Sequence, residues 1–437
     1  MEVTTQRVSL WRHSNFLKLW TSETISSFGG QFSQVAMPFV AIPILHATSS
    51  ELGILQAAST APFLIFGLLV GVWADRHRRR PIMVVANIGR FILLGSIPVA
   101  FLAGRLSLPL LYLVSFLIGV LTVFFDVAYQ AYLPSLVQRD QLVEANSKLE
   151  ASRATATVAG PGIAGFVVGI VTAPFAIALD ALSFLGSALS LSKIHQQEEM
   201  TARTHNPSML YEIREGLAVV FSDSRLRSIA GSTATSNFFS SAIAPVATLY
   251  LVDPELAASN LGLGLDSLVF GLIFAVGSVG GLIGALLAGR LAARVGVGYA
   301  IIGSMLISGI GLFSFYLATP ALANPLLVVG GTALTLSVLV LMVGQFATFL
   351  SAVVYNINQV SLRQAIVPLR LQGRMNATMR FLVWGTLPFG ALVGGILGVI
   401  IGIRLTILIM AVGGSLAFLW VLLSPVRSLK EVPEPLS

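Results

Sequence analysis

The chain has 437 residues, of which 55% are hydrophobic and only 10% are charged, and its mean hydropathy is +0.87. This composition excludes a water-soluble globular protein, because too few charged side chains are present to cover its surface. The absence of cysteine excludes a disulfide scaffold and thiolate metal sites. A net charge of +7 would suit nucleic acid, but the basic residues are concentrated in particular loops. We therefore expect no nucleic-acid partner.

Stretches long enough to cross a bilayer follow one another along the chain. A spanning helix needs about 20 apolar residues, and unbroken apolar runs of this kind exclude the alternating strands of a membrane β-barrel. In chain order the stretches are Thr24 to Leu45, Leu52 to Ala74, Pro81 to Gly104, Leu106 to Phe125, Ala154 to Leu179, Pro174 to Ser192, Ser228 to Val252, Ser267 to Gly289, Phe381 to Ile403 and Leu405 to Val426. Only Arg90 and Asp180 are charges inside them.

The uncharged stretch from Val295 to Leu362 has room for two or three further spans. With two spans, every Lys and Arg except Arg105 and Arg404 falls on the cytoplasmic side, as the positive-inside rule requires. With three, the basic residues that follow would face out: Arg363, Arg370 and Arg374. We therefore expect a long helix from about Leu326 to Leu362. The fold class is an all-α membrane protein with twelve transmembrane helices and both termini in the cytoplasm.

The polar segment from His195 to Ser224 divides these spans into six and six. It predicts an N-terminal six-helix bundle over 1–194, a cytoplasmic linker over 195–224 and a C-terminal six-helix bundle over 225–437. Within the linker, Pro207 to Ser222 has the periodicity of an amphipathic helix, either on the membrane surface or packed under the bundle. The halves also align in the same order, with Lys18, Ser33 and Pro38 over Arg225, Ser240 and Pro245, at an offset that grows along the chain where loops or helix ends could lengthen. Two parallel repeats place a substrate site at their interface near the membrane midplane.

Two short motifs resemble signatures of the major facilitator superfamily. The loop GVWADRHRRRP matches the family's signature loop at five positions: Gly71, Asp75, Arg76, Arg79 and Arg80. The segment ATVAGPGIAG resembles the antiporter motif, with matches at Gly160, Pro161 and Gly165. The family's usual arginine on helix four is missing, since its position falls near Ser115. The stretches NFLKLWTSETISSFGGQ, AYLPSLVQRDQLVEANS and ALDALSFLGSAL resemble the macrolide-efflux and siderophore-exporter branch, whose members are drug:proton antiporters.

The resemblance implies roles for the loop and for the cavity. In the family, the residue at Asp75 interacts with the partner bundle and stabilises the outward-open state. The basic cluster from Arg76 to Arg80 is equally well explained as an anchor for anionic lipid headgroups. The resemblance also implies that helices one, four, seven and ten line a central cavity.

Acids within the uncharged stretches or directly next to them, on the helices that these stretches predict, are candidates for proton or substrate coupling: Glu23, Asp126 and Asp180. An ionisable group there costs about 2.5 to 3.5 kcal/mol on insertion scales, so its presence favours a function. Burial favours the neutral form of an acid, which can then take up a proton on one side of the membrane and release it on the other. For Asp180, a hydrogen-bonded packing role is the stronger alternative. For Glu23 and Asp126 the alternative is a static ion pair with Arg153 or Arg380.

Polar side chains at helical spacing accompany these acids and predict the lining of the cavity. A polar face inside lipid must line a cavity or contact another helix. The expected lining residues are Ser27, Gln34, Tyr129, Asn237, Gln345, Tyr355, Asn356 and Gln359.

These patterns predict a secondary transporter in the plasma membrane that exports amphipathic small molecules in exchange for protons. Export of one metabolite such as a siderophore, lysolipid movement and a non-transporting receptor are the alternatives. The motif GxxxxGK[ST] is absent and the five histidines are scattered, so we expect neither an enzyme nor a cofactor or metal. The expected partners are the substrate, which Glu23 or Asp126 would favour as a cation, together with protons and membrane lipids. We expect a monomer.

Overall fold

A row of long helices makes up the first half of the chain. The structure is a computed structural model and describes residues 10–74, 77–138, 141–196, 209–322, 324–329 and 332–431. After the short 3-10 helix η1 (Leu10–Arg12), the helices are α1 (Ser14–Ala41), α2 (Ser49–Ala74), α3 (Arg79–Leu102), α4 (Leu108–Leu136), α5 (Leu142–Val171) and α6 (Ala173–Ser192).

The second half begins with α7 (Met209–Ser222), which covers the expected amphipathic helix except for Pro207 and Ser208, which lie outside the described residues. The helices that follow are α8 (Ser224–Val252), α9 (Pro254–Ala258), α10 (Ser267–Val295), α11 (Val297–Gly311), α12 (Phe313–Leu317), η3 (Pro320–Leu322), α13 (Leu336–Ile366), α14 (Leu369–Trp384), α15 (Thr386–Ile400), α16 (Ile403–Ser415), η4 (Leu416–Phe418), α17 (Leu419–Leu422) and η5 (Pro425–Ser428). Two strands, β1 (Pro325–Val329) and β2 (Thr332–Thr335), precede α13.

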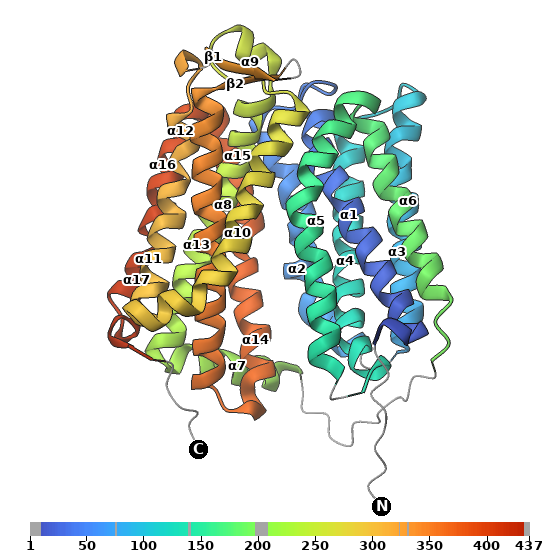
Figure 1. Ribbon diagram of the computed structural model, residues 1–437, viewed down its shortest axis with the longest axis vertical. Helices are drawn as coiled ribbons and strands as arrows, with labels where there is room; N and C mark the ends of the chain where they lie inside the picture. The colour runs from blue at the N-terminus through green and yellow to red at the C-terminus, as the bar shows by residue number, and fades with distance from the viewer. Residues whose placement is uncertain are drawn as a thin grey trace, which may run out of the picture.

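The helices form two groups that stand side by side (Figure 1). Helices α1 to α6 make up one group, and α8 together with α10 to α17 makes up the other. In Figure 1, helix α7 lies at the lower end of the molecule, whereas α9 and the strands lie at the upper end. Residue boundaries for two domains stay a prediction.

Side-chain caps fix where several of these helices start. Asp223 accepts hydrogen bonds from the backbone N–H of Arg225 and Leu226 at the start of α8. Asp266 caps α10 through Val269 N at 2.8 Å, and Thr335 caps α13 through Val338 N at 3.2 Å. Caps of this kind satisfy backbone donors that have no partner within the helix.

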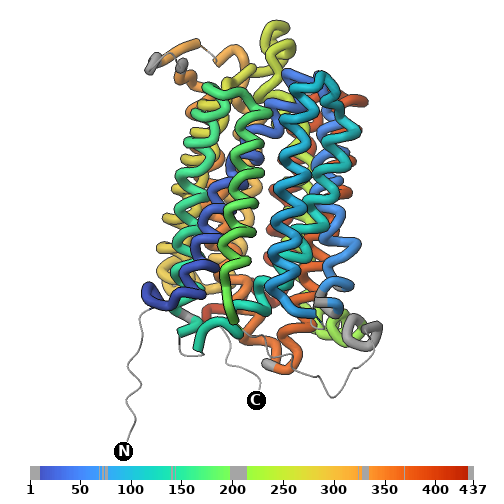
Figure 2. The backbone as a smooth tube through the Cα atoms, turned by 90° about the vertical axis from the view of Figure 1, so that its right-hand side faces the viewer, coloured from blue at the N-terminus to red at the C-terminus, as the bar shows by residue number. Residues whose placement is uncertain are grey.

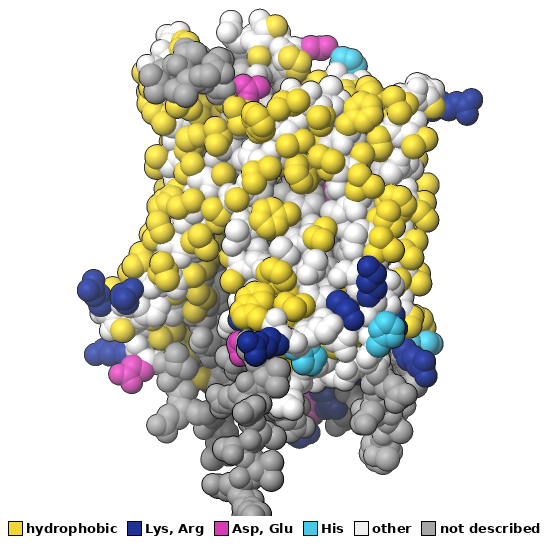
Figure 3. Space-filling view, turned by 45° about the vertical axis from the view of Figure 1, so that its right-hand side comes forward, with side chains coloured by type: hydrophobic (Ala, Val, Ile, Leu, Met, Phe, Trp, Pro, Cys, Tyr) yellow, Lys and Arg dark blue, Asp and Glu magenta, His cyan; other side chains and the backbone are white. Residues whose placement is uncertain are grey.

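The outer surface of the helices is apolar. Large hydrophobic side chains such as Val85, Ile170 and Leu286 are 65 to 71% exposed. Figure 3 shows hydrophobic side chains over the middle of the surface, with most of the visible basic side chains near its lower end. An exposed apolar belt of this extent is the surface of a protein whose solvent is lipid.

Nine helices in the described part of the chain are long and apolar enough to cross a membrane. Helices α1, α2 and α8, with 28, 26 and 29 residues, are not among these nine. They are nevertheless longer than the roughly 20 residues that a span needs. A multi-span helical fold is therefore confirmed, whereas twelve spans and the side of the termini stay predictions.

The expected helix from Leu326 to Leu362 was wrong at its start. Residues Pro325–Val329 and Thr332–Thr335 form an antiparallel pair of strands, and helix α13 begins only at Leu336. Figure 2 shows this pair at the end of the molecule opposite α7. The sequence from Leu326 to Val329 is as apolar as a span, so hydropathy alone cannot separate a strand from a helix there.

The two groups of helices are joined at the upper end along two close seams. Between α5 and α10, Ser267 donates a hydrogen bond to the carbonyl of Gly165 at 2.9 Å. Between α2 and α15, Ser49 donates to the carbonyl of Gly395 at 3.0 Å. An exposed ion pair between His46 and Glu255, 3.6 Å apart, lies at the same end. The structure is thus closed at its upper end.

Candidate functional site

Glu23 and Asp126 lie on α1 and α4, and both are close enough to the buried Arg90 of α3 to interact with it electrostatically. Glu23 is 8% exposed, and its Oε2 lies 3.8 Å from the guanidinium of Arg153 on α5. Its other oxygen, Oε1, is buried without a hydrogen-bond partner. Arg90, Arg153 and Arg380 are the cations that act on Asp126. Glu23 and Asp126 therefore lie within electrostatic range of one buried arginine in the first group of helices.

Arg90 is held in this position from several sides. It is 4% exposed, and its guanidinium carbon lies 4.7 Å from the ring centroid of Phe125 and 5.0 Å from that of Phe184. It donates to Asn87 Oδ1 at 3.0 Å, and Asn87 in turn donates to Ser187 at 2.7 Å. Cation–π contacts and hydrogen bonds of this kind offset part of the cost of burying a charge.

Asp180 on α6 also lies within electrostatic range of Arg90, but its carboxylate is engaged by neighbouring hydroxyls. Ser33 of α1 and Ser183 of α6 both donate hydrogen bonds to its carboxylate, and the side chain is 2% exposed. This arrangement favours the packing role over proton transfer for Asp180. The choice between them stays a prediction.

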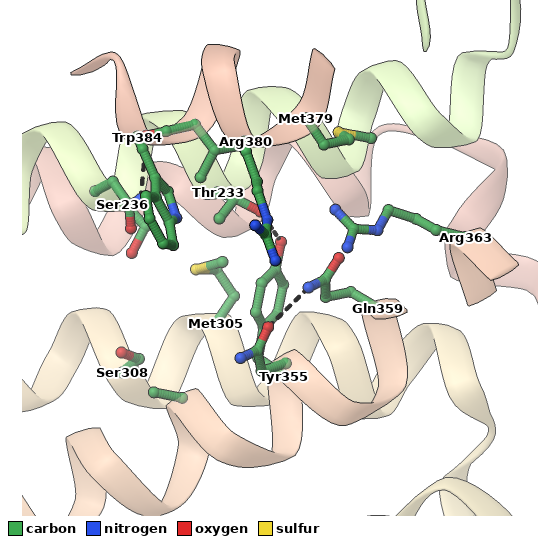
Figure 4. A pocket seen from close by; sticks show the side chains of 14 residues that line it. Thr233, Ser236, Met305, Ser308, Tyr355, Gln359, Arg363, Met379, Arg380 and Trp384 are labelled. Atoms are coloured by element: carbon green, nitrogen blue, oxygen red, sulfur yellow. Dashed lines mark hydrogen bonds between the residues drawn. The ribbon is translucent and has the colours of Figure 1, made fainter. Parts of the chain in front are cut away.

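A cavity of about 360 Å³ lies within the second group of helices (Figure 4). Its lining comes from α8, α11, α13 and α14 and comprises Thr233, Ser236, Asn237, Met305, Ser308, Ala352, Tyr355, Asn356, Gln359, Arg363, Met379, Arg380, Val383 and Trp384. Trp384 is 40% exposed, and Arg380 is exposed as well. The cavity is therefore open to its surroundings.

Four of the expected lining residues take part in this cavity. Tyr355 exchanges a 2.6 Å hydrogen bond with Thr233, which fixes α13 against α8. Gln359 donates to Asn356 at 2.8 Å, and Asn237 donates to the carbonyl of Val383 at 3.1 Å. Gln359 Oε1 is buried without a partner.

The other expected lining residues lie elsewhere. Gln345 is 4% exposed and packs against Gly277 of α10, outside the cavity. Ser27 and Tyr129 are half-buried in the first group, and Gln34 is exposed on α1. Tyr129 stacks on Phe125, which links it to the Arg90 cluster. Ser27, Gln34 and Tyr129 as cavity residues stay predictions.

The signature loop is only partly described. Asp75 and Arg76 lie outside the described residues, and Gly71 belongs to the last turns of α2. Arg79 and Arg80 begin α3, and Arg80 donates hydrogen bonds to the carbonyls of Leu191 and Ser192 at the end of α6. Arg80 thus ties α3 to α6 within one group, at a helix end where a cation is favourable.

The antiporter-like motif lies at the seam between α5 and α10. Gly165 is so close to the Ser267 carbonyl that a Cβ atom would overlap it, and Pro161 lies equally close to Gly271. Gly160 faces the other way and packs against Gln31 of α1. The motif therefore permits close helix packing on both sides of α5.

Arg90, Arg363 and Arg380 are the site residues for which sequence reasoning gave no role in the cavity. Arg90 was noted only as a charge within a span, although the cost of a buried charge applies to it as well as to Glu23. From the sequence, Arg363 and Arg380 are cytoplasmic charges that set topology, and Arg380 is also a candidate static partner of Glu23 or Asp126. Only the structure shows that both line the cavity.

Comparisons with known proteins agree with this architecture. The family model described as "Transmembrane secretion effector" (MFS_3) matches residues 5–435. Macrolide efflux protein A of Streptococcus pyogenes is 23% identical over 210 residues, covering 47% of this chain and 51% of that protein. Multidrug resistance protein 2 of Bacillus subtilis is 25% identical over 187 residues, 41% of this chain and 45% of the relative. The chain thus spans about half the length of these curated relatives.

Solved structures show the same fold at low sequence identity. The nucleoside transporter NupG superposes with a TM-score of 0.71 at 13% identity, over 94% of this chain and 99% of that one. An inward-facing bacterial homologue of the iron transporter ferroportin gives a TM-score of 0.70 at 17% identity, over 95% and 99%. The chain therefore belongs to the transmembrane secretion effector family of the major facilitator superfamily, whose members are multi-pass transporters of the plasma membrane and not enzymes.

Proposed function

We propose that the protein exports amphipathic small molecules across the plasma membrane in exchange for protons, by alternating access. The observation that carries the proposal is the placement of two acids on long apolar helices: Glu23 is buried beside Arg153, and Glu23 and Asp126 both lie within electrostatic range of Arg90. Acids retained at such a cost are suited to bind and release protons. The curated relatives that share half of the chain are named for macrolide and multidrug efflux, which supports export.

The placement of Asp126 connects the acids to the second group of helices. Arg380, which lines the cavity on α14, is one of the cations that act on Asp126 across the interface between the groups. A substrate that occupies the cavity would change the field at Asp126. Binding of substrate and binding of a proton would then be coupled through electrostatics, which is what exchange requires.

Closure at the upper end supports an alternating mechanism. If the lower end is cytoplasmic, as the basic residues there favour, the structure corresponds to a state open to the cytoplasm. Export then requires the seams at the upper end to part and the lower end to close around the substrate. Two clusters of buried side chains each lie within a single group, which supports movement of the groups as units, whereas a third cluster joins the groups and would have to part.

Accumulation of compounds in cells tests this proposal. Cells that express the protein should accumulate less of several amphipathic dyes and macrolides than cells without it, and a proton uncoupler should abolish the difference. An effect confined to one secreted metabolite would replace broad export with a dedicated exporter. No change in the flux of any compound would contradict the proposal.

A further inference from the structure

Two arginines line the cavity without an acid beside them. Arg363 of α13 and Arg380 of α14 both face it, and no Asp or Glu is among the described residues of its lining (Figure 4). No acid in the described part of the chain forms an ion pair with either guanidinium. The positive charge of the cavity therefore has no counter-charge within its lining, and Asp126 of the first group acts on Arg380 only from beyond ion-pair distance.

Both arginines retain unused binding capacity. Nε of Arg363 is buried without a hydrogen-bond partner. Arg380 places its guanidinium 5.9 Å from the ring centroid of Trp384, a contact that leaves its N–H donors unused. Arg380 also acts on Arg363 as a like charge. Two neighbouring cations that repel each other, with one buried donor unpartnered, are stabilised when an anion binds between them.

The rest of the pocket suits a ligand with an apolar body. Trp384, Met305 and Met379 provide aromatic and thioether surface, and Met side chains adapt to ligands of different shape. Asn356 and Gln359 supply amide groups on the opposite wall, where Gln359 Oε1 is a buried acceptor without a partner. The walls thus combine a cationic end with an apolar surface and a few polar groups.

We propose that this cavity binds the anionic head of an amphipathic substrate, with Arg363 and Arg380 on a sulfonate, phosphate or carboxylate group and Trp384 against its apolar body. The proposal deepens the proposed function and rests on it, since it names the charge class of the exported compound. The expectation that the substrate is a cation rests on Glu23 and Asp126, which both belong to the first group of helices. The cavity in the second group favours an anion instead. Guanidinium groups suit such anions because their N–H donors match two oxygens at once.

Equilibrium binding of three probes with the same apolar body tests the charge preference. The probes are 1-naphthalenesulfonate, 1-naphthalenemethanol and (1-naphthylmethyl)trimethylammonium, whose charges do not change with pH. The full-length protein is placed in nanodiscs of phosphatidylcholine and titrated by calorimetry. The anion should bind at least ten-fold more tightly than either of the other two probes.

Variants of the two arginines test whether the preference for the anionic probe arises in this cavity. Arg363→Gln and Arg380→Gln should each weaken binding of the anion about ten-fold and leave binding of the neutral probe unchanged, which also shows that the variants are folded. Arg380→Lys should keep most of the preference because it keeps the charge. The control Arg290→Gln removes an exposed cation of α10 outside the cavity and should change nothing.

Equal affinity for the three probes, no binding of the anion, or an unchanged preference in both glutamine variants would overturn the proposal. Phosphatidylglycerol added to the nanodiscs distinguishes the source of the anion. If phosphatidylglycerol competes with 1-naphthalenesulfonate, the site accepts a lipid headgroup. If it does not compete, the ligand is a soluble amphiphile. Both results are consistent with an anion-binding site. Binding is measured without a proton gradient, so the result does not depend on whether the protein exchanges protons. Equally, a failure to bind the anion would not by itself contradict proton-coupled export.

Discussion

At the scale of single residues, the charges divide between the two groups of helices. The acids Glu23 and Asp126 belong to the first group, where Arg90 and Arg153 partly compensate them. The second group contributes Arg363 and Arg380 without an acid in the cavity lining. A substrate between the groups would therefore contact the arginines of the second group, while the acids of the first group bind and release protons.

Removal of Arg90 should destabilise the protein because it takes away a buried cation that acts on both Glu23 and Asp126. A hydrogen bond made by a charged group contributes about 1.5 to 3 kcal/mol. Arg90→Gln loses such a bond to Asn87 together with two cation–π contacts, so it should lower the thermal unfolding midpoint. Asp126→Asn in the same chain should restore part of that loss. The midpoints of both single variants and of the double variant measure this coupling. Additive losses would show that the two side chains do not interact.

The sequence identified some of these residues and missed others for a physical reason. A carboxylate in an apolar run is conspicuous, so Glu23 and Asp126 could be selected without a structure. Arg363 lies at the end of a span, where a cation is expected from topology alone. Its exposure to a cavity depends on how α13 packs against α8 and α14, which no local pattern records.

At the scale of helices, the seams between the two groups depend on glycines, whose lack of a side chain lets two helices approach closely. A Cβ atom at Gly165 would overlap the carbonyl of Ser267, and one at Gly53 of α2 would lie 2.6 Å from the carbonyl of Ala391 on α15. Backbones can approach this closely only where small residues face each other. The seams are therefore sensitive to the addition of a single methyl group.

Gly165→Ala should weaken closure at the upper end, because overpacking costs about 1 to 3 kcal/mol. One turn away, Gly169→Ala is the matched control, since its Cβ would lie 3.5 Å from Ser267 Oγ, an ordinary contact. The native chain has no cysteine, so spin labels at His46→Cys and Glu255→Cys report the upper distance without background. Electron paramagnetic resonance should show a larger population of long distances in Gly165→Ala only. The same distances in both variants would argue against a seam that needs glycine.

The strand pair before α13 shows where element prediction from sequence ends. Most spans were predicted because an apolar run of helical length has few alternatives in a membrane. Pro325 to Thr335 is apolar too, but it contains Gly330-Gly331, a pair that favours a hairpin turn. That pair was the signal that could have separated the strands from the helix.

At the scale of the whole molecule, alternating access requires that closure at one end excludes closure at the other. The lower ends of α5 and α14 belong to different groups, so Ala151 and Ala377, both exposed, can carry a second pair of spin labels after substitution by cysteine. The distance between labels at 151 and 377 should shorten under the conditions that lengthen the distance between labels at 46 and 255. Two distances that lengthen together, or that vary independently, would contradict alternating access.

Proton flux driven by substrate in proteoliposomes measures the coupling between the two acids and transport in a single assay. With the pH-sensitive dye pyranine inside the vesicles and 1-naphthalenesulfonate or a macrolide added under a pH gradient, the native protein should move protons only when a compound is present. The double variant Glu23→Gln with Asp126→Asn should abolish this proton movement and still bind the compound. Substrate-driven proton movement that persists in the double variant would contradict the account.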